Sequence, residues 1–174
     1  HGIVPTSSTT SQLALGDAIS IAVMLQKKFS KSDFKKYHPS GNLGKKLRTV
    51  EDLMLKKNKI PFINESASFD LAIKIINSKK LGVGIIRNKK NETTGIFTDG
   101  DIKRTLRMNE DLNAIKIKSL MTKNPISIDK EILAAKAIAI MNEKKITSLC
   151  VHSKSNKKKT IGILHIHNLI SENI

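Results

Sequence analysis

The sequence predicts an α/β (α+β) fold in which two tandem β-α-β-β-α repeats pack with pseudo-twofold symmetry, preceded by a helical N-terminal segment. The main observation is an internal repeat, because three sequence blocks occur twice in the same order. Within each copy, apolar residues recur first at helical spacing and then in two strand-like runs. The repeat starts after residue 46, so the predicted units are 1–46, 47–108 and 109–174.

The three blocks recur at nearly constant offsets of 67, 65 and 67 positions. They are VEDLM (50–54) with IKSLM (117–121), AIKIINSKKL (72–81) with AIAIMNEKKI (137–146), and GIFTDGDI (95–102) with GILHIHNL (162–169). The change of offset means that the intervening loops differ by two residues. Chance rarely keeps three such blocks in order, so we interpret the chain as a duplication.

Each copy has the same predicted order of elements. A short extended piece, IPFI or PISI, precedes an amphipathic helix, and in the first copy Phe69, Ala72, Ile73 and Ile76 share one face of that helix. Two strands joined by a polar turn follow, and a second helix closes the unit. A unit of about 60 residues buries its sheet poorly by itself. We therefore expect the copies to pack face to face, with clefts where strand ends and closing helices converge.

The composition is that of a globular protein without a membrane span. Hydrophobic residues make up 39% of the 174 residues, and no apolar run approaches the roughly 18 residues of a spanning helix. The N-terminus lacks the charged-then-apolar pattern of a signal peptide, so we expect a cytoplasmic location. Cys150 is the single cysteine, which excludes an intrachain disulfide, and its setting SLCVH predicts a buried strand residue.

The net charge of +16 raises nucleic acid as a partner, but the charge pattern argues against it. Only four of the 31 basic residues are Arg, and the lysines are spread along helix faces and turns. Aromatic residues, which could stack on bases, make up 3% of the chain. We expect neither a nucleic-acid nor a membrane partner.

Thr98 and Asp101 are candidate ligand-binding residues. Thr98 lies where a strand meets a helix, and free N–H groups at the start of a helix attract anions such as phosphate. Asp101, three residues later, offers two acceptors that suit a pair of ribose hydroxyls. The same spacing is close to a capping box, which would stabilise the helix without any ligand. Spacing alone leaves both interpretations open, and the cleft expected between the copies favours a ligand.

With GIFTDGDI at the end of its third strand, the duplicated unit resembles a tandem pair of cystathionine β-synthase (CBS) domains over residues 47–174. The resemblance implies a module that binds adenosine nucleotides or related ligands and regulates an attached enzyme or transporter. It also implies that Thr98 contacts phosphate and Asp101 contacts ribose. We expect an adenine or cytidine nucleotide, for example a nucleotide-activated sugar acid, as the regulatory ligand.

The second copy departs from this pattern, because His165 and Asn168 occupy the Thr and Asp positions. Asn168 can still bond a hydroxyl, so both residues stay candidates for ligand binding, but we expect at most one well-formed nucleotide-type site. His165 and His167 without a third ligand nearby are too few for a zinc-type centre, so no metal site is predicted.

The N-terminal segment predicts two helices of different character. Residues 11–28 predict a very apolar helix behind a Ser/Thr-rich loop, with Thr9 or Thr10 as a possible cap. SKSDFKKYH predicts a short capped helix that ends before Pro39, because a residue preceding proline is pushed out of helical geometry. A single apolar helix is unstable as a free appendage in water, so it requires a partner.

This segment, PTSSTTSQLALGDAISIAVM followed by FSKSDFKKYHPSGNLGKKL and a CBS pair, is similar to the end of the sugar isomerase (SIS) domain of D-arabinose 5-phosphate isomerases. These enzymes interconvert D-ribulose 5-phosphate and D-arabinose 5-phosphate and supply the sugar acid Kdo of lipopolysaccharide. The resemblance implies homo-tetramers, no required cofactor, and an active-site role for His38 in the His-Pro-x-Gly loop. Ser40 replaces the usual first glycine of that loop.

One histidine cannot isomerise a sugar phosphate. The reaction also needs a base at the carbon and donors for the developing enediolate, and the resemblance places these groups in earlier parts of a SIS domain. Spacing alone favours an exposed loop histidine at position 38. We therefore expect an inactive chain that is mainly a regulatory, nucleotide-binding CBS pair. The alternative is a stand-alone nucleotide sensor whose N-terminal helices dock on a partner protein.

Overall fold

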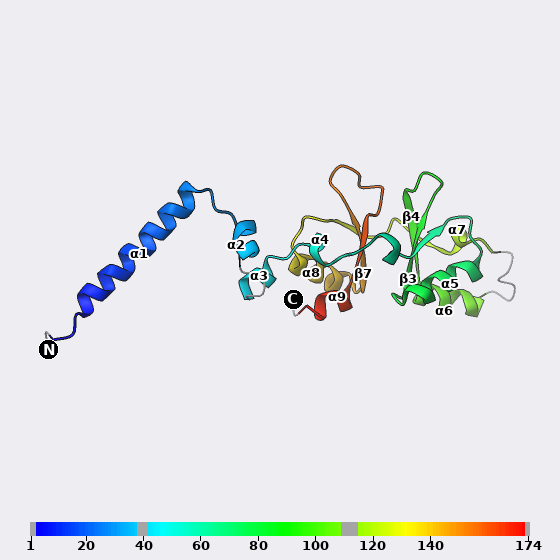
Figure 1. Ribbon diagram of the computed structural model, residues 1–174. Helices are drawn as coiled ribbons and strands as arrows, with labels where there is room; N and C mark the ends of the chain where they lie inside the picture. The colour runs from blue at the N-terminus through cyan, green and yellow to red at the C-terminus, as the bar shows by residue number, and fades with distance from the viewer. Residues whose placement is uncertain (1–2, 38–41, 109–114, 173–174) are drawn as a thin grey trace. The chain divides into compact units, whose positions relative to one another are not determined.

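The computed structural model describes residues 3–37, 42–108 and 115–172. The chain forms two compact units, residues 1–47 and residues 48–174. The second unit contains both copies of the repeat and has two four-stranded sheets, which are drawn with their helices in Figure 1.

The N-terminal unit is helical. Its helices are α1 (Thr6–Gln26), α2 (Lys31–Tyr37) and α3 (Asn42–Lys46). Helix α1 starts before the predicted residue 11, and within it Thr9 Oγ1 donates to the Thr6 carbonyl at 3.0 Å. The predicted cap was wrong, since Pro5 is the N-cap residue. No α1 residue is buried, and no described helix has the length and apolar character needed to cross a membrane.

Helix α2 is the predicted short capped helix. The Ser30 N–H and hydroxyl donate to Asp33 Oδ2 at 2.8 and 2.6 Å, and the Asp33 N–H donates to Ser30 Oγ at 3.3 Å. These bonds form a capping box and lower the pKa of Asp33. The Phe29 ring stacks on Tyr37 with centroids 6.2 Å apart, which ties the break after α1 to the end of α2. The predicted catalytic residue His38 lies outside the described residues.

The first repeat follows the predicted order. Its elements are β2 (Phe62–Asn64), α5 (Phe69–Lys79), β3 (Val83–Arg87), β4 (Thr93–Thr98) and α6 (Asp99–Met108). Phe69, Ala72 and Ile76 are buried on α5, as the helical spacing predicts. Ser68 caps this helix by accepting a bond from the Leu71 N–H at 3.3 Å.

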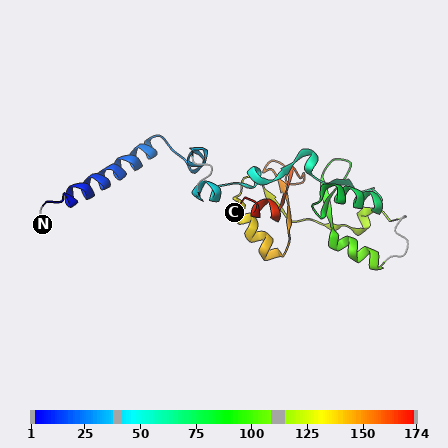
Figure 2. The same cartoon turned by 60° about the horizontal axis from the view of Figure 1, so that its bottom comes forward.

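The second repeat has the same order of elements. They are β6 (Ser127–Asp129), α8 (Ala134–Lys144), β7 (Ser148–His152), β8 (Gly162–His165) and α9 (Ile166–Ile170). Figure 2 shows α8 and α9 side by side on this repeat, where they pack against each other. Cys150 is a buried residue of β7, as predicted, and burial raises the pKa of its thiol to about 11.

Each sheet takes its fourth strand from the other repeat. The leading segments that carry these strands are α4 (Val50–Leu53) with β1 (Leu55–Lys56) and the 3-10 helix Lys57–Lys59, and α7 (Ile117–Leu120) with β5 (Thr122–Lys123). Strand β1 pairs antiparallel with β8 and β5 with β4, which gives the orders β1-β8-β7-β6 and β2-β3-β4-β5. The sequence analysis did not predict this exchange.

The exchange is symmetric down to single hydrogen bonds. The Val50 N–H donates to the Ile132 carbonyl at 2.9 Å, and the Ile117 N–H donates to the Ala67 carbonyl at 3.0 Å. The donors and the acceptors of these two bonds are equivalent by the repeat offsets of 67 and 65. The turns that join the strands of each repeat also meet, because the hydroxyls of Thr93 and Thr160 lie 2.7 Å apart.

Two glycines make room for the leading segments. A Cβ atom at Gly162 would lie 2.3 Å from Met54 Sδ, and one at Gly95 would lie 2.6 Å from Met121 Sδ. Gly95 and Gly162 occupy equivalent positions, as do Met54 and Met121. Any side chain at either glycine would therefore collide with the segment that completes its sheet.

Buried apolar side chains form a core in each repeat and a third cluster that joins the repeats. The third cluster contains Ile60, Val83, Ile85, Cys150 and Ile163. Because Ile85 and Cys150 are equivalent positions of the two copies, the same part of each sheet contributes to the joint. The expected face-to-face packing is therefore confirmed.

Two ion pairs connect the leading segments to the repeats that they join. Equivalent positions carry opposite charges: the first leading segment contributes a carboxylate to its pair, and the second contributes a lysine. Lys130 Nζ lies 2.9 Å from Glu51 Oε2, and Lys118 Nζ lies 3.4 Å from Glu65 Oε1. Glu51 is equivalent to Lys118, and Glu65 is equivalent to Lys130. A leading segment on the wrong repeat, in the same chain or in a second copy, would bring Glu51 to Glu65 and Lys118 to Lys130. The charges therefore favour pairing of repeat one with repeat two.

The glycine contacts predict a loss of stability on substitution. Gly162→Ala and Gly95→Ala are each expected to lower the free energy of unfolding by about 1–3 kcal/mol, the usual effect of overpacking a filled site. Urea unfolding followed by circular dichroism measures this loss. Gly100→Ala is the control, since a Cβ atom there would meet only Thr98 Oγ1 at 3.6 Å. Equal stability of all three variants would contradict the close packing.

The ion pairs predict a charge-exchange effect. The E51K/K130E variant keeps two attractive native pairs but also makes the wrong pairings 51–65 and 118–130 attractive. After refolding at low salt, where charges are least screened, we expect carboxyl–amine cross-linking and mass spectrometry to detect both wrong pairs. Adding E65K and K118E makes the wrong pairings 51–65 and 118–130 repulsive again. The fourfold variant should therefore have the same mass distribution as the wild type by light scattering. Native cross-links alone in the double variant would refute the pairing role.

Candidate ligand-binding cleft

One cleft of the repeat unit has a size suited to a nucleotide. Its volume is about 670 Å³, within the range of roughly 300–1,000 Å³ that is usual for ligand pockets. The first repeat contributes the end of α5, the start of β3 and the end of β4. The second contributes the segment from β5 toward β6, the end of α8, the start of β7 and the end of β8. Strand ends and closing helices thus converge on a cleft, as predicted.

Much of the wall consists of equivalent residues from the two copies. Lys80 and Lys145 are the C-cap residues of α5 and α8, and both have left-handed backbone, with φ of 55° and 53°. Thr98 and His165 form a second equivalent pair. The segment from Thr122 to Ile126 has no counterpart from the first repeat among the described lining residues, so the cleft is closed on one side by the second leading segment alone.

Thr98 and Asp101 are hydrogen-bonded to each other but line different hollows. Thr98 lines the cleft, whereas Asp101 lines a second, smaller hollow of about 330 Å³. The Thr98 N–H and hydroxyl both donate to Asp101 Oδ2 at 2.8 Å, and the Asp101 N–H donates to Thr98 Oγ1 at 3.3 Å. Asp101 Oδ1 pairs with the Arg104 guanidinium. The Asp101 carboxylate is thus engaged in a capping box and an ion pair, and a ribose would have to compete for it.

Asp99, which the sequence analysis did not select, is the carboxylate that lines the cleft. Its N–H donates to the Gly82 carbonyl at 3.0 Å. A Cβ atom at Gly82 would lie 2.8 Å from Asp99 Oδ2, so this carboxylate lies directly over the glycine backbone. Gly82 has a φ of 63°, which favours glycine at that position. Among the described residues, the Asp99 carboxylate has no ion-pair partner.

His165 and His167 both line the cleft, with ring centroids 5.0 Å apart. The His167 N–H donates to His165 Nδ1 at 3.3 Å, so the proton of a neutral His165 ring is assigned to Nε2. Burial, and then the neighbouring His167, lower the pKa of His165 and favour its neutral form. Residues 3–37, 42–108 and 115–172 contain no group of three or more potential metal ligands.

Asn168 is not part of the cleft lining. Its Oδ1 atom is buried and has no hydrogen-bond partner. An unpaired buried acceptor costs stability, so this amide can gain from a donor brought by a ligand or by a rotation of the side chain.

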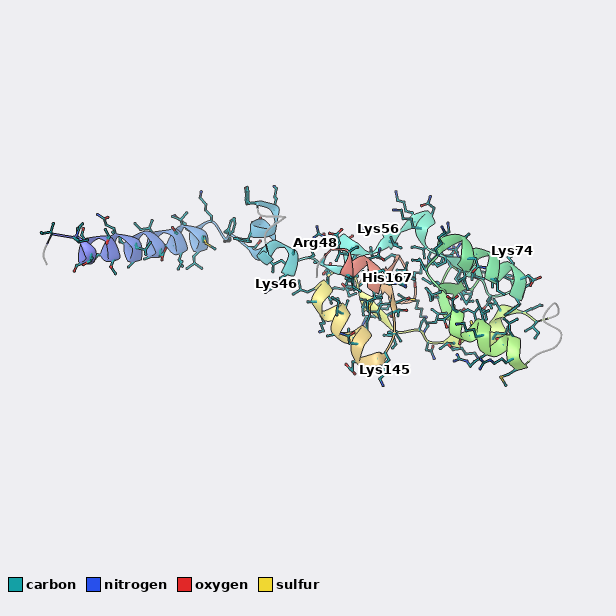
Figure 3. The ribbon with its side chains drawn as sticks, turned by 90° about the horizontal axis from the view of Figure 1, so that it is seen from below. Lys46, Arg48, Lys56, Lys74, Lys145 and His167 are labelled. Carbon is teal, nitrogen blue, oxygen red and sulfur yellow. The ribbon has the colours of Figure 1, made fainter. Side chains whose placement is uncertain are left out.

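Lys80 and Lys145 were also not predicted as site residues. Figure 3 labels Lys145 at the end of α8 and His167 on α9. A sequence signal existed, because the lysine pairs of SKKL and EKKI end the same block in both copies. The chain is rich in lysine, so these lysine pairs look like those of ordinary helix C-termini. Only their position in the cleft wall marks Lys80 and Lys145 as site residues.

A family model for the CBS domain matches residues 50–107 and 117–173. The chain belongs to the CBS domain family. Each matched range begins with a leading segment and ends at the closing helix of the same repeat, so each CBS domain includes the strand that it gives to the other sheet.

Curated relatives of this CBS pair include arabinose 5-phosphate isomerases. The chain is 41% identical over 169 residues to arabinose 5-phosphate isomerase KdsD of Francisella tularensis. It is 36% identical over 170 residues to KdsD of Yersinia pestis. Both alignments cover 97% of this chain and 51% of the relative, so the chain spans about half the length of the curated relatives it matches.

Solved CBS structures share the fold at low sequence identity. CBSX2 in complex with AMP matches with a TM-score of 0.61 and 22% identity, over 72% of this chain and 95% of that one. The CBS domain pair of MJ0100, in complex with 5′-methylthioadenosine and S-adenosyl-L-methionine, has a TM-score of 0.63 and 20% identity, over 72% and 94%. These matches confirm the predicted two-repeat fold.

Proposed function

We propose that this chain is the C-terminal part of an arabinose 5-phosphate isomerase and that its CBS pair regulates the enzyme by binding a nucleotide-type ligand. The observation that carries the first half is the extent of the alignments. They cover 97% of the chain, whereas the family model starts only at residue 50. The similarity to the isomerases therefore includes α1–α3, which lie outside the CBS domains. This supports the assignment of these helices to the end of a SIS domain.

Helix α1 supports the same assignment. It exposes large apolar side chains on all of its faces, such as Leu13 at 69% and Leu25 at 74%. Helices that are apolar all round are found buried within larger cores. The rest of a SIS domain is the proposed cover, and self-association into a homo-tetramer, as the SIS resemblance implies, is proposed for the intact enzyme.

The intact enzyme is proposed to interconvert D-ribulose 5-phosphate and D-arabinose 5-phosphate in the cytoplasm, on the route to the Kdo of lipopolysaccharide. His38 is the proposed active-site contribution of this chain, and no cofactor is required. The catalytic base and the phosphate-binding groups would come from the part of a SIS domain that precedes α1. The chain alone is therefore proposed to be inactive.

The proposed regulatory ligand is an adenine or cytidine nucleotide in the 670 Å³ cleft. The cleft volume, the position of Thr98 in its wall and the fold shared with an AMP-bound CBS protein support this proposal. Thr98, Asp101, His165 and Asn168 remain the proposed contacts. Asp99 is added as a second candidate for the ribose, because its carboxylate already lies in the wall.

The chain alone is expected to form no D-arabinose 5-phosphate from D-ribulose 5-phosphate. A longer product of the same gene, with a SIS domain encoded upstream of His1, should be active and should lose turnover on His38→Ala. A coupled assay of both proteins measures this. Turnover by the 174-residue chain that disappears on His38→Ala would overturn the proposal. A gene without an upstream SIS domain would instead favour a stand-alone sensor.

Nucleotide binding is expected to raise the unfolding temperature. A ligand that binds only the native state adds about 2.7 kcal/mol at 100 times its Kd. The measurement is a thermal shift with AMP, ATP and CMP. Asp99→Asn should lose most of the shift if Asp99 holds the ribose. Asp101→Asn should lower the unfolding temperature of the ligand-free protein, because it weakens the capping box. It should also lose the nucleotide-induced shift only if Asp101 is the ribose ligand. A full shift in both variants would contradict ribose binding at this end.

A further inference from the structure

The charges of the cleft wall are unbalanced. Its ionisable groups are the Lys80 and Lys145 amines, the His165 and His167 rings, the Asp99 carboxylate and the Cys150 thiol. At neutral pH the two lysines are cations, while burial keeps the thiol, with its pKa of about 11, protonated. Two lysines and one aspartate therefore line the cleft, which leaves an excess of positive charge along its wall. This balance favours an anionic ligand over a neutral or cationic nucleoside.

The two ends of the cleft differ in the same sense. The Asp99 carboxylate lies over Gly82 at the first-repeat end. The position equivalent to Asp99 in the second copy is Ile166, and the position equivalent to Gly100 is His167. The second-repeat end therefore has no carboxylate at the position of Asp99, and the imidazoles of His165 and His167 line the cleft there. A phosphate is repelled at the Asp99 end, where ribose hydroxyls fit, and is favoured at the histidine end. In this orientation Thr98 does not hold the phosphate, in contrast to the role that the CBS resemblance implies for it.

We infer that the cleft binds a phosphate-bearing ligand with its phosphate against His165 and His167, and that binding takes up a proton from solvent. This inference rests on the proposed nucleotide binding and adds the orientation and pH dependence of the ligand. With His165 Nδ1 occupied by the His167 N–H, the free ring atom of His165 is Nε2, a donor suited to a phosphate oxygen.

Proton uptake follows from the change in the surroundings of the rings. In the free cleft, burial and then the neighbouring His167 ring lower the pKa of His165. Lys80, Lys145 and Asp99 line the same cleft. A phosphate dianion beside the rings favours the imidazolium form and raises that pKa. Between pH 6.5 and 7.5 a larger fraction of His165 is then protonated in the complex than in the free protein, so affinity rises as pH falls.

The test compares AMP with adenosine, which lacks the phosphate, by isothermal titration calorimetry on the full chain. Titration at pH 7 in buffers of different ionisation enthalpy gives the number of protons taken up. We expect AMP to bind roughly tenfold more tightly than adenosine, the effect of one charge-assisted contact. We also expect net proton uptake with AMP only, and tighter AMP binding at pH 6.5 than at pH 7.5.

Three variants test which residues cause the effect, and two of them form a matched pair. His165→Thr restores the residue of the first copy and keeps an acceptor for the His167 N–H, since Thr is a good cap residue, so the variant should fold. It should lose most of the proton uptake that accompanies AMP binding. Lys145→Gln should weaken AMP about as strongly as the missing phosphate does, whereas Lys74→Gln, an exposed lysine on α5 outside the cleft lining (Figure 3), should bind as wild type.

The outcomes separate this inference from the proposed function. Binding of neither AMP nor adenosine would refute nucleotide binding in this cleft and the inference with it. Equal affinity for both compounds without proton uptake would leave nucleotide binding intact and overturn the inference. Proton uptake that is undiminished in His165→Thr, with the fold confirmed by circular dichroism, would also overturn it.

Discussion

The exchange of leading segments is the constraint on which the rest of the structure depends. Neither repeat completes its own sheet: β1 lies on β8, and β5 lies on β4. The exchange is possible because the sheet edge is bare at Gly95 and Gly162, where methionines of the incoming segments take the place of a side chain. Each repeat therefore completes its sheet only with the other, so we expect the two to unfold as one unit although the sequence divides them.

The exchange also builds the cleft. Strand β5 is held on the first sheet, and the residues that follow it, up to Ile126, line the cleft before the chain enters the second repeat. A ligand there touches both repeats and the segment that crosses between them. Any change in how the repeats pack must then change ligand affinity, and by the same free energy the ligand biases that packing. This reciprocity is what a regulatory module requires.

Periodicity in the sequence was sufficient to predict the main helices and strands. For example, α5 buries Phe69, Ala72 and Ile76, as helical spacing requires. It could not reveal the exchange, because β1 and β5 are two residues long and carry no pattern that names a partner. For the site, Thr98 was placed in the cleft wall and Asp101 beside it. Which carboxylate of the DGD sequence faces the cleft depends on the first turn of α6, where the capping bond to Thr98 holds Asp101 and leaves Asp99 in the wall. The spacing of residues in the sequence does not show which of these two carboxylates faces the cleft.

Specificity arises where the two copies differ. A fully symmetric pair would accept its leading segments in wrong combinations and would bind a ligand equally well in two opposite orientations. The exchanged charges of Glu51 and Lys118 act against the first ambiguity. The second is reduced because the position of Asp99 is Ile166 in the second copy, and that of Thr98 is His165. With the acid at one end and the imidazoles at the other, the proposed nucleotide would have one preferred direction, and it would then contact the two equivalent repeats differently.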